Sequence, residues 1–434
     1  MKVHERSVCV GWLGVCLAAP APAFSSNVDA LYFGGPIVTV DDKNPGAGAV
    51  AVKAGKIIAV GSRTAVETAQ KGPKTRMVDL GGKTMIPGFI DAHGHMMEGT
   101  VLIREFLRIM PRLNQKQQMA LLEAGQDLYA KYGHTTAQEG RALPANVDLY
   151  IAAAKAGRLK LDAVLYPEVL LLGKSGFMKS RYAGRQYRDG LRIGGVKLTP
   201  DASPQGRTAW LSQPNFKPPP GQPASFAGYP ALSDDQAITA VGLAYRNNWQ
   251  IITHTNGDAA IDQLIKAVEI ASARYPGKDR RPVMIHGQTL REDQVPKIKA
   301  LGIFPALFPM HTFYWGGWYL DTVLGPERAA SISPTGWMLK NDMIFSSQHD
   351  APVAFPDTMR VLSATVNRTT RSNQVLGPEH RVEPIRRPQG DGAVGGLPAL
   401  RGEGQGFDRS RQACGFRNFV RQPPDGRADE DRRH

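Results

Sequence analysis

Short apolar runs alternate with longer amphipathic segments after Pro87, and this alternation restricts the possible folds more than any other feature of the sequence. Eight of the runs are candidate strands, and segments with a helical period lie between most of them. The eight candidates are residues 88–95, 134–140, 159–169, 193–201, 249–258, 282–288, 302–309 and 343–353. Repeated strand–helix units predict an α/β fold, and eight of them predict a (β/α)8 TIM barrel over residues 87–383.

Capping signals mark where two of the intervening helices begin. Asn114 precedes an amphipathic stretch that ends in glycine, and Ser233 and Gln236 have the spacing of a capping box. Residues 258–275 and 292–301 follow the same helical period. These segments predict the helices that such a barrel needs between its strands.

The residues before the barrel have a different pattern. Residues 24–86 contain short apolar runs separated by Gly and Asn-Pro turns, and "KAG" at 53–55 suits a tight hairpin. This pattern predicts the N-terminal part of a small flanking β-sandwich. Residues 1–23 combine a basic start, a short apolar run and the small residues "APA", which predicts a cleaved signal peptide and a periplasmic or secreted protein.

The strand–helix rhythm stops at about Pro384. Residues 384–434 are rich in Arg and Gly and contain no lysine, which predicts an aberrant, disordered tail. A reading-frame shift in a GC-rich gene would also produce this composition. Either origin would leave the β-sandwich incomplete at its C-terminus.

The chain carries a formal net charge of +14, but its Lys and Arg are scattered and no run of like charges stands out. A solvated basic surface explains this pattern better than a nucleic-acid interface. No segment after the predicted signal peptide has the pattern of a transmembrane helix. We therefore expect a small-molecule substrate, no nucleic-acid partner, no membrane attachment after signal cleavage, and possible assembly into a homo-oligomer.

Residues that can bind a metal follow several of the predicted strands. His93 and His95 end the first strand, and residues i and i+2 of an extended chain point to the same side. The other candidates are Lys197, His254, His286 and Asp350, on the fourth, fifth, sixth and eighth strands. Each of them alone is more often a turn, core or salt-bridge residue. Because barrel enzymes place their chemistry at the strand ends, the set together predicts a centre for zinc or a similar divalent ion.

Five ordered motifs resemble the metal-dependent amidohydrolase superfamily, and within it amidohydrolase family 3. The motifs are MIPGFIDAHGHM, GGVKLTPDASPQGRTAWL, THTNGDAAID, MIHGQ and SSQHDAPV. The resemblance extends over roughly residues 28–383. It implies a barrel flanked by a small β-sandwich built from both chain ends, and a centre of two divalent ions, expected to be zinc.

The resemblance also implies a role for each candidate ligand. His93 and His95 would bind one ion, and His254 and His286 the other. A carbamylated Lys197 would bridge both ions, and Asp350 would be a ligand and the catalytic proton shuttle. Carbamylation makes chemical sense here, because a lysine ammonium cannot ligate a cation whereas a carbamate is an anionic two-oxygen bridge. Two ions held in this way would lower the pKa of a bridging water and polarise the substrate carbonyl.

Three further residues are candidates for the site. Glu139, at the end of the second strand, is a rival to Lys197 as the bridging carboxylate. His311 lies in the aromatic-rich stretch 308–319, where it would either polarise a substrate carbonyl beside a stacking wall or belong to a packed aromatic cluster. Arg207 follows the fourth strand and would either pair with a substrate carboxylate or form a salt bridge within its loop.

The function implied is metal-dependent hydrolysis of a carbon–nitrogen bond in a non-peptide amide or cyclic amide. Two departures from the family pattern bear on it. A long insertion usually follows the HxH strand, and here the chain passes almost directly to the next helix; the tail is the second departure. The alternatives are a deaminase-like hydrolase with one metal, and a truncated family member with impaired catalysis.

Overall fold

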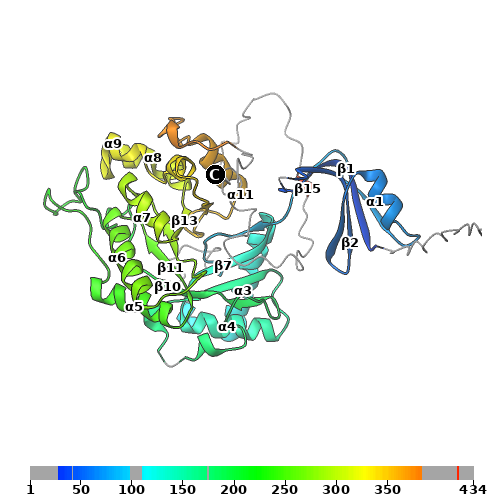
Figure 1. Cartoon of the computed structure of the whole chain (residues 1–434), viewed down its shortest axis with the longest axis horizontal. Helices are drawn as coiled ribbons and strands as arrows, with labels where there is room; N and C mark the ends of the chain where they lie inside the picture. The colour runs from blue at the N-terminus through cyan, green and yellow to red at the C-terminus, as the bar shows by residue number, and fades with distance from the viewer. Residues whose placement is uncertain (1–27, 42, 98–109, 174, 384–417, 420–434) are drawn as a thin grey trace, which may run out of the picture.

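Three β-sheets organise the part of the chain that the structure describes, namely residues 28–41, 43–97, 110–173, 175–383 and 418–419 (Figure 1). The structure is a computed structural model. The predicted signal peptide and the segment 98–109 after the HxH pair lie outside the described residues. So does the predicted tail, except for its residues 418–419.

Two of the sheets are parallel and form the α/β part of the chain. A four-stranded sheet has the order β6-β7-β8-β9, and a five-stranded sheet has the order β10-β11-β12-β13-β14. The strands are β6 Phe89–Ile90, β7 His134–Ala142, β8 Asp162–Pro167, β9 Leu191–Ile193, β10 Gly195–Leu198, β11 Gln250–Thr255, β12 Val283–His286, β13 Phe304–Leu307 and β14 Ser346–Ser347. All eight strands predicted between residues 88 and 353 are present, the fourth as the pair β9 and β10.

Helices follow most of these strands. They are α3 Gln115–Lys131, α4 Pro144–Lys155, α5 Asp234–Arg246, α6 Asp258–Arg274, α7 Val295–Ala300, α8 Met310–Trp318, α9 Gly325–Ala330, α10 Thr335–Lys340 and α11 Thr358–Asn367. Asn114 and Ser233 cap α3 and α5, each in a reciprocal capping box with the third helical residue, so both predicted helix starts are confirmed. No helix among the described residues is long and apolar enough to cross a membrane.

Backbone contacts connect the two parallel sheets at both of their edges. Glu168, which follows β8, forms a parallel bridge with Lys197 in β10. At the other edge the N–H of Asp350 donates to the carbonyl of His93 (3.1 Å), and the N–H of His95 donates to the carbonyl of Ala351 (2.9 Å). The segment after the first strand and the segment after the last strand are therefore direct neighbours.

Apolar side chains pack on both faces of the parallel strands. On the outer face, α5, α6 and α7 cover the second sheet with residues such as Val241, Leu264 and Ile298. On the inner face a single buried cluster contains Val164, Tyr166, Ile252, Val283, Ile285 and Ala306. Because β8 of the first sheet and β11 to β13 of the second sheet contribute to this cluster, the inner faces of the two sheets pack against one another. The fold is thus mixed α/β, with a core between the sheets and another under the helices.

The third sheet lies near the N-terminus and has the order β15-β5-β1-β2-β3, with β4 also paired to β1. Its elements are β1 Ala30–Val38, β2 Gly46–Lys53, β3 Lys56–Gly61, α1 Arg63–Gln70, β4 Arg76–Asp79, β5 Thr84–Met85 and β15 Asn418–Phe419. Figure 1 shows this sheet and α1 beside the larger α/β part. Val66 of α1 packs on one face, while Leu80 and Met85 belong to the cluster on the other.

Two local features of this sheet bear on the sequence predictions. Ala54 and Gly55 have φ angles of 49° and 74°, which is the left-handed pair that a two-residue hairpin between β2 and β3 requires. The predicted hairpin at "KAG" is therefore confirmed. Strand β15 pairs antiparallel with β5, with Asn418 opposite Met85, so a segment from the far end of the chain extends the sheet.

Candidate metal centre

The predicted ligands gather at the carboxyl ends of the parallel strands. His93 and His95 follow β6, Lys197 lies in β10, His254 lies in β11, His286 ends β12, and Asp350 follows β14. His286 and Asp350 have φ angles of 74° and 50°, in the left-handed region that side chains other than glycine rarely adopt. Such backbone conformations concentrate at functional sites, where the surrounding structure holds them in place.

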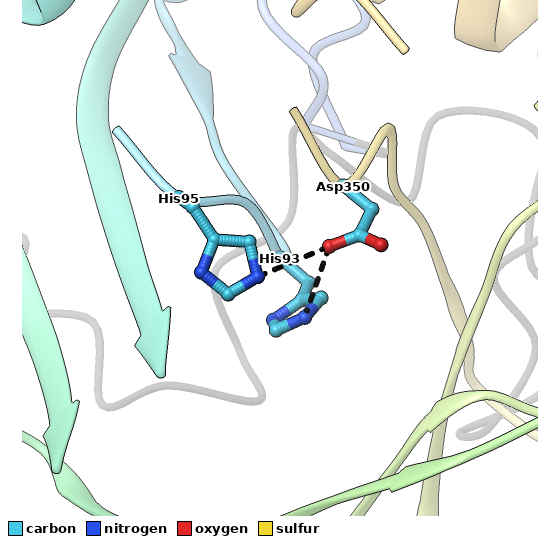
Figure 2. A group of neighbouring side chains, drawn as sticks. All are labelled: His93, His95 and Asp350. Atoms are coloured by element: carbon cyan, nitrogen blue, oxygen red, sulfur yellow. Dashed lines mark ion pairs between the residues drawn. The ribbon is translucent and has the colours of Figure 1, made fainter. Parts of the chain in front are cut away.

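His93, His95 and Asp350 form the tightest group (Figure 2). Nε2 of His93 lies 3.4 Å from Oδ1 of Asp350, and Nε2 of His95 lies 3.3 Å from the same oxygen. All three residues are buried, and one donor atom from each lies within 4.8 Å of the other two. Two imidazoles and a carboxylate converging in this way are suited to a divalent ion such as zinc.

The other ring nitrogens of the two histidines fix their tautomers. Nδ1 of His93 lies 2.7 Å from Oε1 of Gln138, and Nδ1 of His95 lies 3.3 Å from Oε1 of Glu139. Each oxygen accepts a proton from Nδ1, which leaves the lone pair of Nε2 directed at Asp350. Burial, with a smaller contribution from the nearby Lys197, holds the pKa of His93 well below its usual range, so this imidazole is neutral at physiological pH.

The carboxylate of Asp350 completes the fit to a cation. Its Oδ1 is buried and has no hydrogen-bond partner among the described residues. The two Nε2 atoms that face it present lone pairs when each ring carries its proton on Nδ1, as the contacts with Gln138 and Glu139 favour. A metal ion would satisfy all three atoms at once, which is the usual resolution for a buried anion without a donor.

His254 and His286 form a second pair beside the first. Nδ1 of His254 lies 3.0 Å from Nε2 of His286, and Nε2 of His286 lies 3.9 Å from Oδ2 of Asp350. Nε2 of His254 lies 3.2 Å from the carbonyl of Ala202 and 3.0 Å from the side-chain nitrogen of Asn256, so both a hydrogen-bond acceptor and a donor face it. Burial lowers the pKa of His254 to about 3 and that of His286 well below its usual range. The rings of His93 and His286 are 5.4 Å apart, so the two histidine pairs face a common space.

Lys197 lies against the first of these groups. Its Nζ is 3.4 Å from Nε2 of His93, and the residue is 1% exposed. Burial lowers the pKa of Lys197 to about 8, so a substantial part of the amine is neutral at mildly alkaline pH. Only the neutral amine can react with CO2, and this environment therefore favours carbamylation.

The remaining predicted residues lie further out. Glu139 contacts Nδ1 of His95 and also accepts a hydrogen bond from the hydroxyl of Tyr150 (3.2 Å). It therefore lies on the side of the His95 ring that is turned away from Asp350. His311 in α8 is buried and hydrogen-bonded to the hydroxyl of Tyr319. Burial lowers the pKa of His311 to about 3.

Arg207 is engaged by its own loop. Its guanidinium donates to the carbonyls of Lys217 (3.2 Å) and Pro218 (3.1 Å) and lies 5.5 Å from the ring centre of Trp318. These contacts hold Arg207 on backbone oxygens and an aromatic face, and they do not join it to the histidines.

Two residues that were not singled out from the sequence connect the ligands. Oδ1 of Asp91 accepts the N–H of His93 (3.0 Å), and its Oδ2 accepts the N–H of Gln138 (3.1 Å). Nε2 of His349 lies 3.2 Å from Oδ1 of Asp91. The signal for both was available, since Asp91 stands two residues before His93 in the predicted strand 88–95 and His349 directly precedes Asp350.

Comparison with known proteins agrees with this arrangement of motifs. The model of the amidohydrolase family matches residues 100–385, which is more than half of the 434 residues. The chain belongs to the amidohydrolase family, as its motifs predicted. An uncharacterized metal-dependent hydrolase from Pyrococcus furiosus has a similar fold, with a TM-score of 0.67 and 18% sequence identity over 82% of this chain and 91% of that chain.

Two curated relatives match over short segments. The N-substituted formamide deformylase of Arthrobacter pascens is 43% identical over 68 residues, which is 16% of this chain and 12% of that protein. The imidazolonepropionase of Symbiobacterium thermophilum is 47% identical over 50 residues, which is 11% of this chain and 12% of that protein. The chain thus spans about an eighth of the length of each of these relatives in the match.

Proposed function

We propose that this protein is a metal-dependent hydrolase that cleaves a carbon–nitrogen bond in a non-peptide amide or cyclic amide. The observation that carries the proposal is the buried, unpartnered Oδ1 of Asp350 between the Nε2 atoms of His93 and His95. Family membership supports it, and so do the activities of the two curated relatives, a formamide deformylase and an imidazolonepropionase.

The proposed architecture is a closed (β/α)8 barrel, with the N-terminal sheet as part of a flanking β-sandwich. The backbone contacts between Glu168 and Lys197, and between His93 and Asp350, support closure at the two edges of the parallel sheets. The inner cluster shared by both sheets supports a barrel interior filled by side chains.

Two divalent ions, taken to be zinc, are proposed as the cofactor. His93 and His95 would hold one ion and His254 and His286 the other, with a carbamylated Lys197 between them. When bound, the ions would make a water nucleophilic at neutral pH and polarise the scissile carbonyl.

Asp350 has the position of the proton carrier in this proposal. Oδ1 faces the first histidine pair and Oδ2 lies toward His286, so its carboxylate reaches both halves of the centre. It would accept the proton released by the attacking water and return it to the leaving nitrogen. His311 is proposed to contact substrate on the α8 side. In support, its ring centre lies 4.4 Å from that of Phe308, which lies 5.8 Å from that of His286.

A one-metal hydrolase is the second candidate. The tight grouping of His93, His95 and Asp350 within 4.8 Å favours it, because those atoms alone would hold a single ion. The number of metal ions per chain separates the two proposals. A periplasmic or secreted location is also proposed, from the sequence of residues 1–23.

The experiment that tests the function uses full-length protein loaded with zinc in the presence of bicarbonate. It is assayed on a panel of formamides, acyl amides and cyclic imides, with product amine or acid measured directly. Zinc-dependent hydrolysis that disappears with a chelator and returns on adding zinc is expected. A soluble, zinc-bound protein that hydrolyses none of these compounds would support a catalytically impaired family member and overturn the proposal.

A further inference from the structure

Arg141 stands at the same edge of the strands as the metal-centre residues, yet the proposed chemistry gives it no role. It lies near the end of β7, two residues after Glu139, and its side chain is 48% exposed. The pairing of β7 with β8 is irregular between Glu139 and Ala142, so strand alternation does not set the direction of Arg141. Its ion pair with Glu168, whose backbone is bridged to Lys197, holds it beside the strand ends where a substrate would lie.

One edge of the Arg141 guanidinium is held in place. Its Nε donates to Oε2 of Glu168 at 3.1 Å, and Glu168 is 5% exposed. The hydroxyl of Thr199 donates to the same oxygen at 3.0 Å, and the backbone of Glu168 is bridged to Lys197. The side chain of Arg141 is thus anchored by a buried carboxylate whose backbone is bridged to Lys197.

The other edge of the guanidinium is available. Within residues 28–41, 43–97, 110–173, 175–383 and 418–419, the side-chain hydrogen bond of Arg141 is made through Nε, and its Nη1 and Nη2 groups make none. The contrast with Arg207 is direct, because that guanidinium donates to two backbone carbonyls of its own loop. A planar fork with its Nε fixed and its Nη atoms open matches a carboxylate in two-point geometry.

The positive charge of Arg141 also acts on residues of the proposed metal centre. After burial, which is the larger effect, this guanidinium contributes to lowering the pKa values of both Lys197 and His254. Because Glu168 holds Arg141 and is bridged through its backbone to Lys197, a substrate anion bound at Arg141 would lie on the Lys197 side of the proposed ligands.

We propose that Arg141 binds a carboxylate of the substrate, so that the enzyme prefers amides carrying a carboxylate near the scissile carbon–nitrogen bond, as in an N-acyl amino acid. The inference rests on the proposed function and names its substrate class. Glu168 is the positioning residue, because it sets the orientation of the guanidinium without touching the substrate.

The test compares N-acetylalanine with N-isopropylacetamide, in which a methyl group replaces the carboxylate. Zinc-loaded wild-type protein is expected to favour the acid by about 10- to 100-fold in kcat/KM, the range for a charge-assisted hydrogen bond. Arg141→Gln should abolish the preference through a higher KM, with zinc content unchanged, and Arg141→Lys should restore part of it. Arg207→Gln, the matched control, should keep the preference.

Equal rates on the two compounds, or an unchanged preference in Arg141→Gln, would overturn the inference while leaving the proposed hydrolase intact. If neither compound is cleaved, calorimetric titration of N-acetylalanine into zinc-loaded protein decides the question. Binding that Arg141→Gln loses and Arg207→Gln keeps supports the carboxylate site independently of turnover. Absence of binding to the wild-type protein, or loss of zinc from Arg141→Gln, would contradict it.

Discussion

Nε2 of His349 lies 3.2 Å from Oδ1 of Asp91, and this buried contact ties the end of the first strand of the α/β part to the end of the last. Nδ1 of His349 accepts the N–H of Ala351 at 3.0 Å, so the proton of the neutral ring resides on Nε2, the nitrogen that lies near the carboxylate. Asp91 also accepts the N–H of His93. The contact therefore links His93 to the residue that follows His349, which is the proposed ligand Asp350.

Replacing His349 with Gln should weaken zinc binding without removing a ligand. Loss of an outer contact of this kind typically costs about 10- to 100-fold in metal affinity. Zinc affinity is measured by competition with a chromogenic chelator. His380→Gln is the matched control. His380 is also buried, but it packs against Trp337 and is distant in sequence from the proposed ligands. Equal zinc affinities for the two variants would show that the Asp91–His349 contact does not position the centre.

Gly140 lies so close to the ring of His93, a proposed ligand, that there is no room for a side chain at this position. A Cβ at this position in β7 would press into the imidazole of His93, at atoms that include Nδ1. Gly140→Ala should therefore displace His93, break its hydrogen bond to Gln138 and lower zinc affinity by at least about 10-fold. The fold should lose about 1–3 kcal/mol of stability from the overpacking.

Gly317→Ala is the control for Gly140→Ala, because a Cβ at Gly317 in α8 has no atom within 4 Å. Its zinc affinity should equal that of the wild-type protein. Thermal unfolding of the metal-free variants separates the packing effect from the metal effect. A Gly140→Ala protein with wild-type zinc affinity would contradict the placement of His93.

Asp350→Asn should preserve the backbone conformation of the loop and abolish proton transfer by this residue. Asp350 has a φ of 50°, a conformation that asparagine tolerates better than most residues, so the loop is preserved. The amide cannot accept the proton of the attacking water, and kcat should fall by about 10²- to 10⁴-fold. Rates are measured with excess zinc, and the exposed Asp235→Asn serves as the control. Wild-type kcat in Asp350→Asn would exclude the carboxylate as the proton carrier.

Carbamylation should follow the protonation of Lys197. Burial lowers its pKa from 10.5 to about 8, so the neutral amine that reacts with CO2 becomes abundant between pH 7 and 9. Metal-free protein in 13C-bicarbonate should show a carbamate carbon signal that rises over this range and is missing from Lys197→Arg. A signal of equal size in both proteins would assign the carbamate to another amine.

The lowered pKa of Lys197 also makes the stability of the metal-free fold depend on pH. Because the folded pKa of Lys197 lies below that of the unfolded chain, the unfolded chain binds more protons between about pH 8 and 10.5. This residue therefore makes the metal-free fold more stable relative to the unfolded chain as the pH rises through that window.

The sequence predicted the parts of the site that follow from strand order. His93, His95, His254, His286 and Asp350 stand at strand ends, and parallel strands bring those ends to one edge, so their meeting follows from periodicity and motif position. The contacts of Arg141, Glu168 and His349 could not be derived in this way. They depend on which neighbouring strand each side chain faces, and on the bridge between Glu168 and Lys197. The direction of Arg207 could not be predicted either, because it is decided by hydrogen bonds to two backbone carbonyls in an irregular loop.

The central claim is a two-metal centre bridged by a carbamate on Lys197, and metal analysis tests it most directly. Soluble full-length protein and its Lys197→Ala variant are stripped of metal, incubated with zinc with and without bicarbonate, and dialysed. The wild-type protein should hold two zinc ions per chain with bicarbonate and fewer without it, because a carbamate bridge needs CO2. Lys197→Ala should hold at most one ion in either condition. Two zinc ions and full hydrolytic activity in Lys197→Ala would contradict the account.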